Sequence, residues 1–343
     1  MLQQTSDDTQ DEHIFAVVNQ LNKGLEHIQI PKKRHELAQL NLVAGQRAKQ
    51  STAYDVAIGY FKMALNLLEN NAWSYHYSLT LNLHQNIATT CYVRGKFDEM
   101  DGYLSEIFKH GMSLLDKIPA YEIKVQSYLA QSQLKKAVQT AIAVAKLLGI
   151  NLTQQANGLA LQWESAKTKW LLGRRSPAEF IHFPIMEQAK IAAAVRILAS
   201  ANSAAYVGQP ELLAPIVSKQ VHLLVKYGNL PIAAFVYAWY GTLLCGRYLQ
   251  IEVGSQFGQL ALEALDKFGA TGIKAKTVFI VNCMIAHWRC HVSETLTPLW
   301  QSYQDGRESG DVEYASWAIL VRCEHLFCMG HSLVELEREF QFA

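Results

Sequence analysis

The sequence has little of what marks β-rich, nucleic-acid-binding or membrane proteins. Only 8 of the 343 residues are proline, which leaves few residues suited to the turns of a β-rich fold. Lys and Arg (31) nearly balance Asp and Glu (30), so the chain has neither the basic surplus of a nucleic-acid-binding protein nor the acidic surplus of a disordered tail. We find no apolar run approaching the roughly 18–20 residues of a membrane span. The first residues also lack the basic and apolar segments of a signal peptide. These absences predict a cytoplasmic protein with no membrane span and no nucleic-acid partner.

Signatures of ATP chemistry are missing as well. A P-loop needs a glycine five residues before its Gly-Lys pair and a hydroxyl residue after it. Gly95-Lys96, the Gly-Lys pair of this chain, has Thr90 at the first place and Phe97 at the second. Neither a His-Arg-Asp nor an Asp-Phe-Gly kinase signature occurs. The sequence therefore predicts no catalytic residues, no cofactor and no enzymatic activity.

The six cysteines lie in apolar helical stretches, which favours reduced thiols over a disulfide framework. The best metal hypothesis uses Cys283, His287 and His291, which are spaced by four and would share one face of a helix. Cysteine also behaves as a small hydrophobic residue in helix cores, and close CxxC-type pairs are absent here. We therefore predict no metal site and keep these three residues as the weak candidates.

Helical periodicity runs through the rest of the chain, which is 50% hydrophobic. Apolar residues recur at intervals of three and four over 54–68, 100–112 and 137–148, as expected of helices with one buried face. Trp288, Trp300 and Trp317 fall within such segments. We interpret them as packing residues, with a peptide-binding lining as the alternative.

Two sets of glycines recur about every forty residues. In the first, the intervals from Gly111 are 38, 79, 41 and 41 residues, so the 79 corresponds to two periods. Glycine suits the left-handed residue that ends a helix, and a fixed period of this length is typical of helical-repeat proteins. The predicted repeat-turn residues are Gly95, Gly111, Gly149, Gly208, Gly228, Gly246, Gly269, Gly310 and Gly330.

The predicted fold is all-α: an α-solenoid of antiparallel helix pairs with a period of about 38–42 residues. Between about 151 and 190 the pattern loosens around Pro177 and Pro184. We therefore divide the chain into an N-terminal segment with a first helix (1–30), a first sub-array (31–150), an irregular helical linker (151–190) and a second sub-array (191–343).

Several stretches resemble the tetratricopeptide-like region of very large bacterial signalling proteins of the cyanobacterial type. They are 36–54, 121–126, 223–229, 257–262 and 310–316, and the resemblance covers about residues 14–338. Proteins of that family join a serine/threonine-kinase-like domain, an AAA-type ATPase, this helical region, a GAF domain and a sensor histidine kinase. The resemblance implies a fragment that lies between the ATPase and the GAF and kinase domains.

Two functions follow as expectations. The first is a non-catalytic interaction and coupling module of such a two-component signalling kinase, and the alternative is a stand-alone adaptor that binds a peptide or protein on its concave face. The partner in either case is protein. The last helix, from Ser332, is expected to leave an apolar stripe of Leu333, Leu336 and Phe340 uncovered, which favours self-association or fraying.

Overall fold

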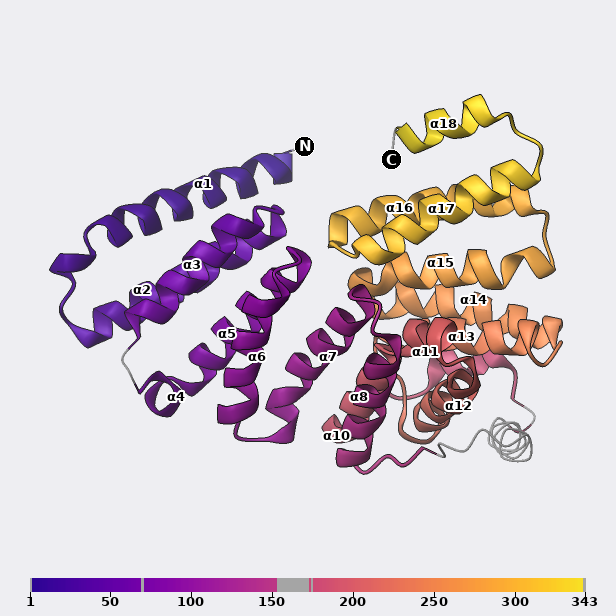
Figure 1. Ribbon diagram of the computed structural model, residues 1–343, viewed down its shortest axis with the longest axis horizontal. Coiled ribbons are helices and arrows are strands. Elements are labelled where there is room, and N and C mark those ends of the chain that lie inside the picture. Colours follow the sequence, from indigo (N-terminus) through magenta and orange to yellow (C-terminus); the bar gives the residue numbers. More distant parts are fainter. Residues whose placement is uncertain (1, 69–70, 153–172, 174, 342–343) are drawn as a thin grey trace. The chain divides into compact units, whose positions relative to one another are not determined.

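The computed structural model describes residues 2–68, 71–152, 173 and 175–341. These residues form helices joined by turns (Figure 1). They contain no strand, and their one β-type pairing is an isolated bridge between Ile185 and Asn229. The predicted all-α class is therefore confirmed over this part of the chain.

The chain divides into two compact units, residues 1–127 and 128–343. The division falls within one helix, between Ser127 and Tyr128, and not in the stretch 151–190 that the sequence indicated. Of that predicted linker, residues 153–172 and 174 lie outside the described residues. Its remainder holds the short 3-10 helix η2 (Pro177–His182), whose capping box joins Ser176 and Glu179.

The helices of unit 1 are α1 (Leu2–Lys23), η1 (Leu25–His27), α2 (Pro31–Gln50), α3 (Tyr54–Leu67), α4 (Ala72–Tyr75), α5 (Tyr77–Val93), α6 (Phe97–His110) and the first part of α7 (Leu114–Ala130). Unit 2 continues with α8 (Leu134–Leu147), η2, α10 (Ala189–Ala199), α11 (Asn202–Gly208), α12 (Pro210–Tyr227), α13 (Ala233–Gly246) and α14 (Ile251–Phe268). It ends with η3 (Thr271–Ile273), α15 (Lys274–Met284), η4 (Ala286–Trp288), η5 (Val292–Thr295), α16 (Leu296–Ser309), α17 (Val312–Cys328) and α18 (Leu333–Gln341). Neighbours in sequence pack most extensively as α2 with α3, α5 with α6, α13 with α14, and α16 with α17.

Among the described residues, six helices end in the same hydrogen-bonded turn. At the first of them, Thr52 has a φ of 60°, its N–H donates to the Lys49 carbonyl, and the N–H of Ala53 donates to the Ala48 carbonyl at 2.8 Å. This pair of bonds is the Schellman motif, which satisfies carbonyls that the helix leaves open. The same two bonds recur around the left-handed residues Gly95, Ser132, Gly149, Gly269 and Gly330.

Buried residues occur at the same sequence distances from several of the left-handed turn residues. Counting from Thr52, the positions −7, −4, +5, +9 and +12 are Gly45, Ala48, Ala57, Phe61 and Ala64, and all five are buried. Around Gly95 the same positions are also all buried, and they hold Ala88, Cys91, Met100, Leu104 and Ile107. The positions around Leu249 are buried too: Thr242, Cys245, Gly254, Gly258 and Ala261. The repeat thus lies in the spacing of turn and core positions more than in the identity of the residues.

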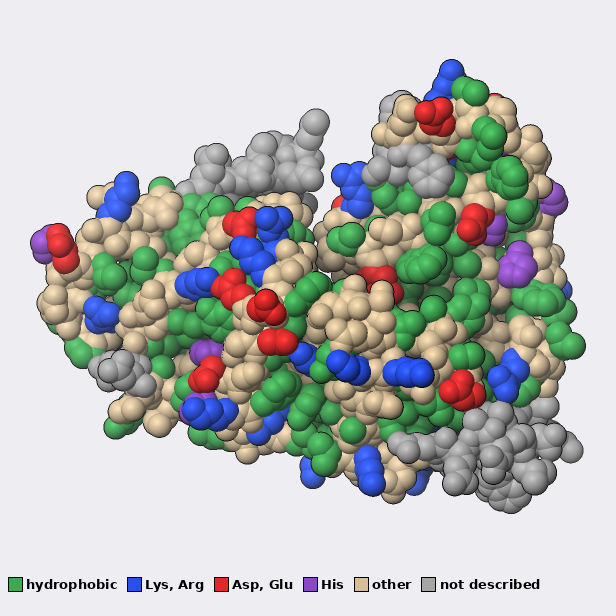
Figure 2. All heavy atoms as spheres, in the orientation of Figure 1, with side chains coloured by type: hydrophobic (Ala, Val, Ile, Leu, Met, Phe, Trp, Pro, Cys, Tyr) green, Lys and Arg blue, Asp and Glu red, His purple; other side chains and the backbone are tan. Residues whose placement is uncertain are grey.

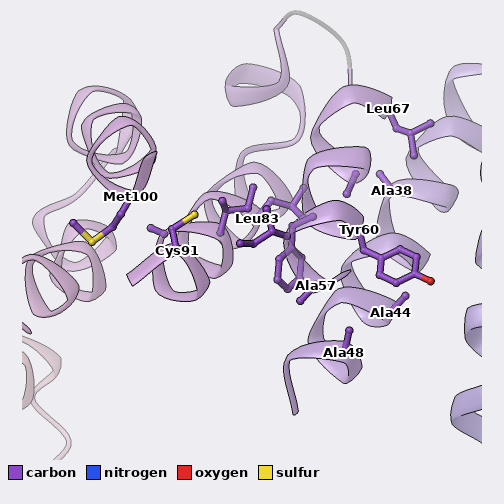
Figure 3. Close-up of a cluster of buried hydrophobic side chains, with 14 of the residues drawn as sticks. Ala38, Ala44, Ala48, Ala57, Tyr60, Leu67, Leu83, Cys91 and Met100 are labelled. Atoms are coloured by element: carbon purple, nitrogen blue, oxygen red, sulfur yellow. The ribbon is translucent and has the colours of Figure 1, made fainter. Parts of the chain in front are cut away.

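Small residues let paired helices approach closely. In unit 1, Ala44, Ala48 and Ala57 lie in the core between α2 and α3, close to Tyr60 (Figure 3). A Cβ added at Gly45 would overlap the ring of Phe61. In unit 2, a Cβ at Gly254 of α14 would overlap the Cys245 sulfur of α13. These contacts leave no space for a larger side chain.

Six of the nine predicted turn glycines have positive φ: Gly95, Gly149, Gly228, Gly269, Gly310 and Gly330. Gly111, Gly208 and Gly246 also lie at helix ends, but without a positive φ. Gly111 leaves α6 with a φ of −57°, and Gly208 is the last residue of α11, where an added Cβ would strike Leu134. Gly246 is the last residue of α13, and the left-handed residue of its turn is Leu249.

The last helix, α18, packs against α17. Leu336 is buried with Cys323 and Leu326, and Arg322 of α17 forms a salt bridge with Glu339. The expectation that Leu336 lies on an uncovered stripe is therefore wrong. Leu333 does lie open, with 71% of its surface exposed, and the side chain of Phe340 lies outside what the structure describes.

One stretch of the described residues, Ala189–Gly208, is long and apolar enough to span a membrane by length and composition. This stretch was not expected from the sequence. It is divided between α10 and α11, and 56% of the apolar window is buried within the protein. The buried Asn202 and Gln220 side chains exchange hydrogen bonds there, at 3.2 and 3.3 Å. This packing is that of a core segment.

Candidate interaction surfaces

A polar groove of about 310 Å³ lies between α5 and α7 in unit 1. Three wall residues come from α5, where Gln85, Asn86 and Thr89 follow helical spacing and share a face. The facing wall of α7 consists of Pro119, Glu122, Ile123 and Gln126. Five of these seven residues have amide, hydroxyl or carboxylate side chains, so the groove offers hydrogen-bonding groups on both walls.

Local hydrogen bonds fix the α5 wall. Gln85 Nε2 donates to the Asp116 carbonyl at 3.2 Å, and Asn86 Nδ2 donates to the Asn82 carbonyl at 3.0 Å. Thr89 Oγ1 donates to the Gln85 carbonyl at 2.8 Å. These bonds hold the amides by their NH₂ ends, which leaves amide oxygens to accept hydrogen bonds from a ligand.

A second polar group lies in unit 2, at the start of α17. The positive charge of Lys276, from α15, acts on the carboxyl groups of both Asp311 and Glu313 and lowers their pKa values. The Lys276 ammonium lies 5.3 Å from the centre of the Phe235 ring, a cation–π distance. Beneath them Tyr314 is buried, and its hydroxyl lies 2.5 Å from Ser203 Oγ of α11.

Burial, and to a lesser extent the like charge of Asp311, raise the pKa of Glu313 to about 7, and the nearby Lys276 ammonium opposes this shift. Burial likewise raises the pKa of Asp311. Two partly buried acidic groups thus share one lysine, and a further cation placed beside them would favour their ionised forms.

The metal candidates do not share a helix. Cys283 lies near the end of α15, which stops at Met284, while His287 is in η4 and His291 precedes η5. Burial, with Glu324 nearby, raises the pKa of the Cys283 thiol to about 12, so it stays protonated when a metal would need the thiolate. Among the described residues no group of three His, Cys, Asp or Glu could hold a metal ion.

Neither surface was predicted from the sequence as a site. The available signal was polar residues at helical spacing on otherwise apolar helices, as in Gln85, Asn86 and Thr89. Such a pattern also describes any solvated helix face. Only the packing of α5 beside α7 turns it into a groove.

The chain is similar in sequence to part of a known signalling protein. It is similar to hybrid signal transduction histidine kinase G of Dictyostelium discoideum, with 22% identity over 353 aligned positions. The alignment takes in 94% of this chain and 10% of that protein, so the chain spans about a tenth of its relative's length. No protein-family pattern matches the chain.

Proposed function

We propose that this chain is a non-catalytic interaction and coupling module of a larger cytoplasmic signalling protein. In this proposal its helices form a tetratricopeptide-like α-solenoid of antiparallel pairs. The recurring turn and core register supports that architecture, since each pair carries a buried face that a neighbour must cover. The tetratricopeptide-like assignment rests on the resemblance set out in the sequence analysis.

The observation that carries the functional proposal is the extent of the similarity to the Dictyostelium kinase. Almost the whole of this chain aligns, yet the alignment uses a tenth of that protein. A segment of this kind, without ATP-binding signatures of its own, fits a role that links catalytic domains. Following the resemblance, those domains are an ATPase on the N-terminal side and a GAF domain with a histidine kinase on the C-terminal side.

Reading the coding sequence on both sides of this segment tests the proposal directly. We expect the ATPase motifs upstream and the GAF and kinase motifs downstream, in one reading frame or in adjoining frames. Flanking genes unrelated to signalling would contradict the coupling role and favour the second candidate.

The second candidate is an adaptor that binds an extended peptide, and the α5–α7 groove of unit 1 favours it. Amide side chains on both walls can bond to the N–H and carbonyl groups of a peptide backbone. Peptides selected by display against the protein should lose affinity for an Asn86→Leu, Gln126→Leu variant. A Gln259→Leu variant on the exposed surface of α14 is the control. Unchanged binding by the groove variant would exclude this candidate.

A further inference from the structure

Helix α17 exposes a narrow seam with coiled-coil spacing. The seam consists of Glu313, Trp317, Leu320, Glu324 and Phe327, at alternating intervals of four and three residues. Trp317 is 46% exposed, Leu320 37% and Phe327 61%. Residues spaced in this way form a single stripe along a helix.

The other faces of α17 are occupied. Tyr314, Ala315 and Ala318 are buried in the packing with α15 and α16, while Cys323 and Leu326 lie against Leu336 of α18. Figure 2 shows hydrophobic side chains gathered over the region of α15 and α17, with acidic side chains among them. Trp317, Leu320 and Phe327 thus form an apolar stripe, flanked by Glu313 and Glu324, that the other described helices of unit 2 leave open.

The spacing favours a helix as the occupant. Alternating steps of three and four match the knobs of a second helix that crosses at about 20°. An extended peptide has a repeat of two and bonds to a strand edge, whereas the backbone groups of α17 are used within the helix.

The charges favour a basic occupant. Glu313 and Glu324 lie in the seam, and Asp311 lies beside its start. Of the nearby cations, Lys276 interacts electrostatically with Asp311 and Glu313. Arg322 forms its salt bridge with Glu339 of α18. His325 carries little charge at neutral pH, because burial, with His287 nearby, lowers its pKa. Among the described residues, no Lys or Arg thus forms a salt bridge with Glu324.

We propose that the α17 seam docks a helix of a partner protein that carries apolar residues at the same spacing and a Lys or Arg opposite Glu324. A second copy of this chain fits less well, because pairing two seams would cover each Glu324 with Leu320, Phe327 or the other Glu324. A covered carboxylate without a cation is strongly disfavoured. The proposal rests on the interaction role proposed above, and it specifies the surface and the chemistry of the partner.

Binding of two synthetic helical peptides to the full chain tests this assignment. Both are about three heptads long, with leucine at seam positions, and they differ at one central seam position, which is Lys in the basic peptide and Glu in the acidic one. Fluorescence anisotropy with labelled peptide should show the basic peptide binding about tenfold tighter or more. A peptide with the composition of the basic peptide in scrambled order should bind more weakly than either of the two.

Two substitutions test whether the peptides bind at the seam and not elsewhere on the surface. Glu324→Lys should reverse the preference between the two peptides, and Phe327→Ser should weaken both by about tenfold. Both positions are exposed, so circular dichroism melts should stay close to wild type. The control is Glu263→Lys on the exposed face of α14, where the Glu263 carboxylate accepts a hydrogen bond from Gln259.

Equal affinity for the two peptides, or no reversal in Glu324→Lys, would overturn the proposal. A mass that rises with concentration and falls in Phe327→Ser would assign the seam to self-association instead. Neither outcome bears on the neighbouring domains or on the α5–α7 groove, which are tested by the coding sequence and by the Asn86 and Gln126 variants.

Discussion

At the scale of single residues, several glycines serve close helix packing, a role that the sequence analysis did not consider for them. Gly45 is the clearest case, because its missing side chain makes room for the Phe61 ring of the next helix. Gly59, in the partner helix α3, has nothing within 4 Å of where a Cβ would lie. The two glycines therefore respond differently to the same substitution.

Gly45→Ala should destabilise the protein by about 1–3 kcal/mol, since the new methyl group forces the α2–α3 pair apart. Gly59→Ala should stabilise it by about 0.5–1 kcal/mol, because alanine loses less entropy in an exposed helical position. Urea unfolding followed by circular dichroism measures both. Changes of the same sign would contradict the close packing at Gly45.

Ser132 is a turn residue that glycine would suit better, since its φ is 57°. A left-handed conformation costs a residue with a Cβ about 1–2 kcal/mol, and glycine gives back part of this through its freer unfolded state. Ser132→Gly should therefore stabilise the protein by about 0.5–1 kcal/mol. Gly95→Ser, at the equivalent turn between α5 and α6, should destabilise it. Chemical denaturation of the two variants side by side checks both signs.

At the scale of elements, the sequence predicted helices and their buried stripes well and helix ends less well. Ala57, Phe61 and Ala64 form the core of α3 at the spacing that predicted the helix. The turns at Thr52 and Ser132 could not be found from glycine, because the Schellman bonds and the packing of the flanking helices hold a non-glycine residue in the left-handed region. The seam and the groove escaped prediction for a related reason, as both depend on which neighbour covers a helix face.

Histidine packing should make unit 1 sensitive to acid. His84 lies between the rings of Trp73 and Tyr103, and His35 stacks on His76 with ring centres 4.4 Å apart. Burial lowers the pKa of both His84 and His35, and the neighbouring His76 lowers that of His35 further.

Lowered histidine pKa values make the folded protein less stable in acid. A histidine whose pKa is lowered by folding contributes stability in full above its unfolded pKa, about 6.5, and this contribution is lost as pH falls from 6.5 through the lower pKa of the folded state. We expect the urea midpoint to fall between pH 7.5 and 5.5, and the fall to be smaller in His84→Gln. His27→Gln, an exposed histidine, is the control. An equal fall in all three proteins would exclude His84 as a source.

The short helix α18 should depend on one buried side chain. Leu336 is its contact with Cys323 and Leu326, whereas Leu333 and Val334 lie open. Leu336→Ala should raise hydrogen exchange throughout 333–341 and leave α17 protected, because the contact is local. Leu333→Ser should leave exchange in α18 unchanged. If α18 associates with other copies, Leu333→Ser should also lower the mass measured by light scattering at high concentration.

At the scale of the whole molecule, the turn at Gly95-Lys96, the one Gly-Lys pair of the sequence, supports the proposal of a non-catalytic module. A phosphate loop needs free backbone N–H groups to hold the phosphate oxygens. Here the N–H of Gly95 donates to the Tyr92 carbonyl, and that of Lys96 donates to the Cys91 carbonyl. The Lys96 ammonium lies 2.9 Å from an oxygen of Asp55. Both amides and the ammonium are thus used by the helix end and its neighbour.

Titration of the purified protein with Mg²⁺-ATP should therefore give no saturable heat and no release of phosphate. Gly95→Ser lowers stability by the turn argument above but should leave this result unchanged, because the turn contributes nothing to nucleotide binding. A saturable isotherm for the wild-type protein that is lost in Gly95→Ser or Lys96→Ala would place a nucleotide site at this turn. The proposed division of labour, with catalysis in other domains and this chain as the link, would then have to be abandoned.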